Sequence, residues 1–239
     1  MKKISFLFLA MFAGIVAFSQ SSTPKKVNLS KRDADHFVFQ IASNFWNGAP
    51  DSVTTFAKKI NRSANVYVMY DMPFKTNPKF SVALGIGIGT SAMYFKKMET
   101  KIGSTNKTLP FIRTDTGFNY KKYKLATSYI EIPLEFRFMS KPEDPNKSFK
   151  IALGVKGGLL LNAHTKAKNL QTATGAKVNG NTIKETSKSY FNSSKIAITG
   201  RIGYGPISLF GAYNVTNMFK DAVAADTKLV QIGISFSGL

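Results

Sequence analysis

The sequence predicts an all-β fold: an eight-stranded antiparallel up-and-down β-barrel that crosses a membrane with its strands. The strongest observation is the stretch Phe80–Phe95, in which bulky apolar residues alternate with small ones and three glycines share one face. A helix would scatter these glycines and lose about 1 kcal/mol for each relative to alanine, whereas a strand places them on one side. Seven other segments also alternate, and long and short connections follow one another in turn. This is the pattern of barrels with short periplasmic turns and long extracellular loops.

The first residues predict a signal peptide over residues 1–19. Lys2 and Lys3 precede an apolar run at residues 4–18, which ends in Ala17-Phe18-Ser19 with small residues at the two positions that a signal peptidase inspects. The run is too short for a comfortable membrane span, and an uncleaved anchor helix is the alternative. Residues 20–35 are polar and basic, which predicts a flexible periplasmic leader. The barrel is then expected over residues 36–239.

The charge of the chain indicates an anionic partner. The formal net charge is +20, and loss of Lys2 and Lys3 with the signal peptide would lower it to +18. Such a balance is typical of binding to nucleic acid or to an anionic membrane surface. An exported protein rarely meets nucleic acid, so we expect lipid. The absence of cysteine excludes lipoprotein processing, disulfides and thiolate metal sites.

The first seven strands are expected at about 36–46, 63–74, 80–95, 122–139, 148–163, 190–204 and 207–216. The eighth follows a loop at 217–227, and its alternation covers residues 230–236. In the first strand the apolar face ends where Asn-Gly-Ala-Pro breaks the pattern. In the second strand polar residues face inward, and the outward residues are Val66, Val68, Tyr70 and Met72. A short proline-rich connection then leads into the third.

The fourth strand alternates most clearly. One face carries aliphatic and phenylalanine side chains, and the other carries Tyr129, Glu131, Glu135 and Arg137. The fifth strand is apolar at its odd positions. The sixth, seventh and eighth strands alternate Ile, Leu, Val or Phe with polar residues or glycine. Residues 96–121 and 164–189 are polar and lysine-rich, and we expect both to form long loops.

A soluble β-sandwich or lipocalin-like barrel would also give eight strands. It would not be expected to gather its long loops at one end. Nor would it be expected to place charges on one face of three successive strands while the other face stays apolar. Together with the export signal, these features favour the membrane barrel.

The inward charges predict a network in the barrel lumen, formed by Asp71, Glu131, Glu135, Arg137, Lys156, Lys195 and Arg201. Buried charges persist when they are paired and hydrogen-bonded, and eight strands enclose a space that side chains can fill. We therefore expect the network to plug the lumen, with the glycines of Phe80–Phe95 leaving space for Arg and Lys stems. A gated pore or a small-anion site is the alternative.

Catalytic and metal sites are not predicted. The two histidines are His36 and His164, and a serine triad that uses His164 with Ser187 or Ser189 has no support from spacing. Two histidines without cysteine form a poor metal site, and no cofactor is expected. A lipid A hydrolase is the enzyme class that stays open.

The basic loops predict contact with lipid head groups. Lysines gather near the expected strand ends at Lys96, Lys97, Lys121, Lys122 and Lys124. Their charges either keep the loops solvated or neutralise the phosphates of lipopolysaccharide.

The chain resembles the PorT-like family of small outer-membrane β-barrel proteins. The resemblance rests on residues 129–138, with the sequence YIEIPLEFRF, and is supported by residues 154–158 (GVKGG) and 209–215 (LFGAYNV). It implies an eight-stranded barrel in the outer membrane and no catalytic residues, and the family's namesake takes part in protein secretion.

We therefore expect a non-enzymatic structural or interaction barrel in the outer membrane of a Gram-negative bacterium, reached by Sec-type export. Its expected partners are outer-membrane lipid and lipopolysaccharide, the barrel-assembly machinery during insertion and other envelope proteins, but not nucleic acid. The alternative function is a narrow pore or an accessory component of a protein secretion system.

Overall fold

Eight antiparallel strands close into a barrel in the computed structural model, which describes residues 36–114 and 117–238. The barrel strands are β1 (Phe37–Asn47), β2 (Arg62–Pro73), β3 (Phe80–Phe95), β6 (Asn119–Met139), β7 (Phe149–Gln171), β9 (Ser194–Tyr204), β10 (Ile207–Asn214) and β11 (Lys228–Ser237). The predicted eight-stranded fold is confirmed. The predicted signal peptide and leader lie outside the described residues.

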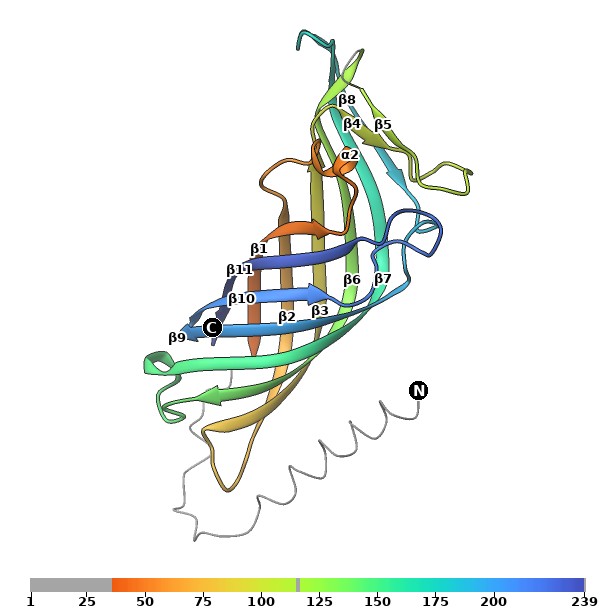
Figure 1. Ribbon diagram of the computed structural model, residues 1–239. Helices are drawn as coiled ribbons and strands as arrows, with labels where there is room; N and C mark the ends of the chain where they lie inside the picture. The colour runs from red at the N-terminus through yellow and green to blue at the C-terminus, as the bar shows by residue number, and fades with distance from the viewer. Residues whose placement is uncertain (1–35, 115–116, 239) are drawn as a thin grey trace.

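The ring closes because its first and last strands pair. β1 runs antiparallel to β11 from Val38 opposite Ser237 to Asn47 opposite Lys228, and β6 joins β3 to β7. Figure 1 shows these strands wrapping around one axis, with three short connections at the lower end. A closed ring leaves no barrel strand with an open edge along its paired length.

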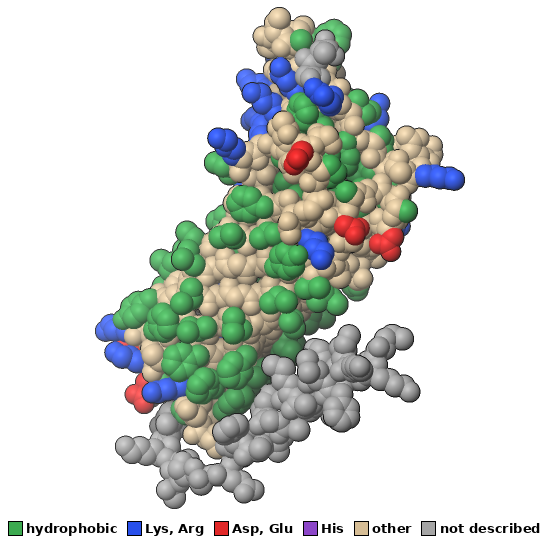
Figure 2. Space-filling model, in the orientation of Figure 1, with side chains coloured by type: hydrophobic (Ala, Val, Ile, Leu, Met, Phe, Trp, Pro, Cys, Tyr) green, Lys and Arg blue, Asp and Glu red, His purple; other side chains and the backbone are tan. Residues whose placement is uncertain are grey.

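Side chains of the barrel wall alternate between exposed apolar residues and buried residues. On β3 the even positions point outward, and Ile86 is 53% exposed. On β6 the outward residues include Ile132, which is 56% exposed, while its neighbour Glu131 is buried. Figure 2 shows the hydrophobic side chains spread over the wall, with Lys and Arg mostly toward the upper and lower ends. The wall therefore has the apolar outer belt that a membrane-spanning barrel needs. No helix among the described residues is long and apolar enough to cross a membrane.

The long-loop end carries structure that the sequence did not predict. It holds a helical turn, α2 (Asp51–Thr54), and the short strands β4 (Met98–Thr100) and β5 (Phe111–Arg113). A 3-10 turn, η2 (Pro145–Lys147), lies in the short β6–β7 connection at the other end. The long-loop end is therefore a folded region above the barrel.

The prediction that residues 164–189 form a long loop is wrong over most of this range. β7 continues to Gln171, and β8 (Lys177–Thr186) returns along it as a hairpin. A bulge at Leu161 shifts the alternation of β7 by one residue, because Tyr129 pairs with Leu160 whereas Ser128 pairs with Asn162. Beyond the bulge the strand is polar on its outer face, so the apolar pattern that marks its lower half ends there. The sixth strand also starts later than predicted, at Ser194.

The largest apolar core lies in the upper half of the molecule. It is built from upper strand ends and loop residues, among them Trp46, Phe95, Ile102, Phe191 and Phe219. The rings of Trp46 and Phe219 meet edge to face with centroids 5.8 Å apart, and those of Phe191 and Phe219 are 5.4 Å apart. The upper loops thus fold inward over the barrel opening.

Candidate functional site

Glu131 occupies the centre of the lumen and is fully buried. Its Oε1 lies 2.5 Å from Nζ of Lys195 on β9, and its Oε2 lies 3.1 Å from Nζ of Lys156 on β7. The hydroxyl of Tyr67 on β2 donates a hydrogen bond to Oε2. Lys156 in turn donates to the Tyr67 hydroxyl at 3.2 Å and to Oε1 of Gln231 at 3.4 Å. One carboxylate therefore joins four strands across the lumen.

A second group of charges lies nearer to the short-turn end. Glu135 accepts hydrogen bonds from Nε of Arg137 at 2.9 Å and from Nη2 of Arg201 at 2.7 Å. Arg137 also lies 3.7 Å from Asp71, whose Oδ1 accepts a hydrogen bond from Ser81 at 2.7 Å. All seven side chains that the sequence assigns to the lumen lie there, in two ion-pair groups.

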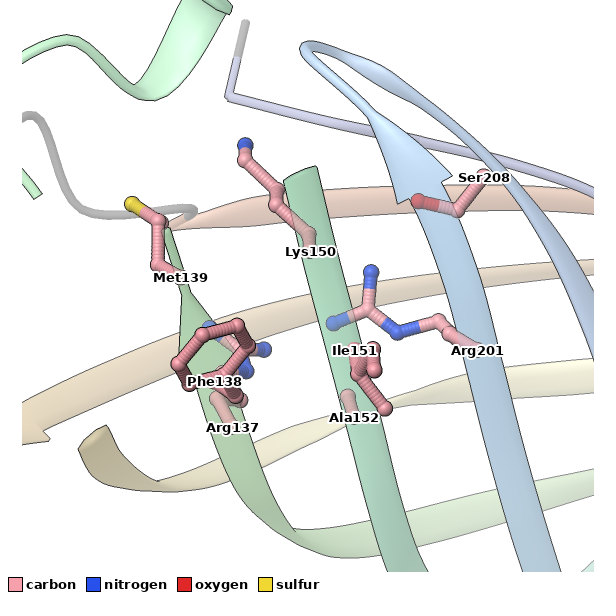
Figure 3. Close-up of a pocket in the computed structure, with 8 residues that line it drawn as sticks. All are labelled: Arg137, Phe138, Met139, Lys150, Ile151, Ala152, Arg201 and Ser208. Carbon is pink, nitrogen blue, oxygen red and sulfur yellow. The ribbon is translucent and has the colours of Figure 1, made fainter. Parts of the chain in front are cut away.

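The lower group borders a small cavity at the short-turn end. Its volume is about 10 Å³, and it is lined by Arg137, Lys150, Arg201 and Ser208 together with apolar neighbours. Figure 3 shows these cationic side chains around one space. A cavity of this size holds about one water molecule. The lumen is therefore filled by side chains at this level.

The glycines of β3 give the network its space. A β-carbon built at Gly87 would lie 2.5 Å from Cδ1 of Tyr67, and one at Gly89 would lie 2.2 Å from Oε1 of Glu131. The side chains that use this space are thus a tyrosine and a glutamate, rather than the arginine and lysine stems expected from the sequence.

Above the charges, the lumen is closed by the apolar core and by hydrogen bonds between loops. The hydroxyl of Tyr190 donates to the carbonyl of Ser104 at 2.7 Å, and Asn192 donates to the carbonyls of Asn217 and Phe219 at 2.8 Å. These contacts tie segments that are far apart in sequence. The upper half of the lumen is therefore filled mainly by apolar side chains, and the lower half by charged ones.

The five lysines expected at head-group height lie at the long-loop end. Lys96 and Lys97 form the turn between β3 and β4, and Lys97 has a φ of 59°. Lys121, Lys122 and Lys124 lie within β6, which starts earlier than predicted. Lys122 and Lys124 point away from the interior, since the alternate residues Tyr123 and Leu125 are buried.

The residues considered for a serine triad do not form one. The Ser187 hydroxyl is hydrogen-bonded to that of Ser189, and Nδ1 of His164 is buried without a hydrogen-bond partner. His36 contacts the carbonyl of Met69 at 3.2 Å. In the described part of the chain, no three His, Asp or Glu side chains gather as a metal site would require.

Four lysines of interest were not identified from the sequence. Lys150 lies in the lower lumen, and Lys166, Lys168 and Lys184 lie on the outer face of β7 and β8. Lys150 shares the even-numbered inward face of β7 with Lys156, so the alternation contained the signal for it. The other three depend on the bulge at Leu161 and the β7–β8 hairpin.

The fold and lumen define a class, the membrane-spanning β-barrels of the outer-membrane type. The family model described as outer membrane protein beta-barrel domain matches residues 18–220, and the chain belongs to this family. A similar solved structure is that of Ail, the attachment invasion locus protein of Yersinia pestis, at 10% identity and a TM-score of 0.35; the match covers 84% of this chain and 94% of Ail. No curated protein matches the chain.

Proposed function

We propose that the protein is a non-enzymatic, non-conducting outer-membrane barrel with a structural or interaction role. The observation that carries this proposal is the occupied lumen. Glu131, Glu135 and their cationic partners fill the lower half, and the core around Phe191 and Phe219 fills the upper half. An eight-stranded barrel has little diameter to spare.

The proposal includes a route to the membrane and a set of partners. Residues 1–19 direct Sec-type export and are removed, residues 20–35 remain as a periplasmic leader, and the barrel-assembly machinery inserts the rest. In the membrane, Lys96, Lys97, Lys121, Lys122 and Lys124 meet the phosphates of lipopolysaccharide, and the upper loops meet other envelope proteins. The position of these lysines above the apolar belt supports this contact.

Conductance in planar lipid bilayers tests the plugged lumen. The wild-type barrel is expected to give no steady current after confirmed insertion. A variant with Glu131→Ala, Lys156→Ala and Lys195→Ala should also give no steady current, because the apolar core around Phe191 and Phe219 still closes the upper half of the lumen. A conducting porin inserted in the same bilayers serves as the control for detection. Steady conductance by the wild type would favour the narrow pore instead.

A second candidate is an accessory role in a protein secretion system. The resemblance of residues 129–138 to the PorT-like family favours it. Deletion of the gene should then change the set of proteins released into the medium, and restoration of the wild-type chain should reverse that change. An unchanged set of secreted proteins would leave the structural role.

A further inference from the structure

Lysines lie directly opposite one another across the outer strands of the long-loop end. Lys124 on β6 pairs with Lys166 on β7, and Lys166 pairs with Lys184 on β8. One step further from the barrel, Lys122 pairs with Lys168. These five residues form what we call the lysine cluster.

All members of the lysine cluster point to the outer face of the sheet. Their neighbours along the strands, Tyr123, Leu125, Thr165 and Ala167, are buried on the inner face. Lys122, Lys168 and Lys184 are exposed, and Lys124 and Lys166 are half-buried. Because adjacent strands are about 4.8 Å apart, the row Lys124, Lys166, Lys184 extends over roughly 10 Å.

The lysine cluster has no carboxylate partner within the described residues. None of its ammonium groups makes an ion pair there. The nearest acid along β8 is Glu185, which pairs with the buried Thr165 and therefore belongs to the inner face. Burial lowers the pKa of Lys124, and the charges of Lys166 and Lys184 lower it further. The same three lysines add to the effect of burial in lowering the pKa of His164.

Like charges directly opposite each other destabilise a sheet. Five unopposed cations on one face are therefore costly without a ligand and well suited to a ligand that carries several negative charges. Lysine supplies compact, mobile ammonium groups, which suit phosphates as point charges. A row of roughly 10 Å fits several phosphates better than one.

The height of the lysine cluster points to the source of those phosphates. The last exposed aliphatic residue of β7 is Leu161, five residues before Lys166. Five residues rise about 16 Å along a strand, or about 12 Å along the barrel axis at a tilt near 40°. We propose that the lysine cluster binds the phosphate groups of the lipopolysaccharide head group and inner core. The inference rests on the proposed outer-membrane function.

The binding test uses the folded full chain and two probes, rough-type lipopolysaccharide and the same material dephosphorylated with hydrofluoric acid. The test variant combines Lys124→Gln, Lys166→Gln and Lys184→Gln. Its control combines Lys75→Gln, Lys79→Gln and Lys141→Gln, which are exposed at the short-turn end and change the charge equally. Wild type and control should prefer the phosphorylated probe at least tenfold. The test variant should lose that preference.

A stability readout separates binding from folding. Without lipopolysaccharide, the test variant should resist urea at least as well as the wild type, because it removes like-charge repulsion. Retention of the tenfold preference by this variant would overturn the proposal.

A third variant separates this inference from the proposed function. If Lys96→Gln, Lys97→Gln and Lys121→Gln together abolish the preference while the test variant keeps it, lipopolysaccharide binds elsewhere and only the lysine cluster is rejected. If the wild type shows no preference for the phosphorylated probe, both the lysine cluster and the proposed lipopolysaccharide contact are rejected.

Discussion

At the scale of single residues, the lumen shows how buried charges are retained. Glu131 is held by two ammonium groups and a hydroxyl, and Glu135 by two guanidinium groups. Removing one partner of a buried ion pair destabilises a protein more than replacing both partners with apolar residues, because the remaining charge stays buried without a counter-charge. The carboxylates should therefore matter more for stability than any exposed acid.

Glu131→Gln should lower the free energy of unfolding by about 3–5 kcal/mol, because it leaves Lys156 and Lys195 buried without their counter-charge. Urea titration of the folded barrel measures the change. Glu143→Gln, an exposed change in a short turn, is the matched control and should stay within about 0.5 kcal/mol. Adding Lys195→Met to Glu131→Gln should recover part of the loss, and a loss no greater than that of the control would contradict the ion-pair network.

His164 reports the field of the lysine cluster. Burial lowers its pKa first, and Lys124, Lys184 and Lys166 lower it further. As the pH falls through about 6.5, the ordinary pKa of histidine, His164 therefore takes up a proton less readily in the folded state than in the unfolded state. Its contribution lowers the free energy of unfolding as the pH becomes more acidic. Lys166→Gln should raise the pKa of His164 in an NMR titration, relative to its value in the wild type. An unchanged pKa would show that the cluster does not act on this ring.

At the scale of elements, β3 separates lipid from lumen by its alternation. Ile86→Lys places a charge in the middle of the apolar belt and should cost about 2–4 kcal/mol of folding free energy in phosphatidylcholine vesicles. Thr90→Lys, also outward-facing but nearer the long-loop end, should cost less because the penalty falls toward the interface. Equal costs at the two positions would mean that the belt is placed wrongly.

Strand alternation predicts the lower barrel well and the upper region poorly. The range Phe80–Phe95 is the same in sequence and structure, and the inward charges of β6 were recognised because apolar residues flank each of them. β8 escaped prediction because both of its faces are largely polar and exposed. No local sequence pattern marks the bulge at Leu161, so the sequence does not predict on which face of the strand Lys166 lies. The upper core includes single apolar residues such as Ile102 and Phe191, which lie in otherwise polar loops. Their burial depends on packing against residues far away in the sequence, so the local pattern does not predict it.

At the scale of the whole molecule, three zones follow one another along the barrel axis. An ion-pair network fills the lower lumen, an apolar core closes the upper lumen, and a basic surface lies outside the upper strands. The apolar outer belt, which faces lipid, lies at the same height as the ion pairs. The most polar part of the interior is therefore surrounded by the most apolar part of the outer surface. This arrangement gives a stable scaffold that presents its upper end to the surroundings.

Depth measurement along β3 tests the central claim most directly, namely that the apolar belt faces lipid. The chain has no cysteine, so single cysteines at Leu84, Ile86, Ile88, Thr90 and Tyr94 each carry one spin label in reconstituted vesicles. The label at Ile86 should be more accessible to oxygen than to a water-soluble nickel chelate, and the preference should reverse by Tyr94. A label at Ile86 that the nickel chelate reaches as readily as one at Tyr94 would contradict the account.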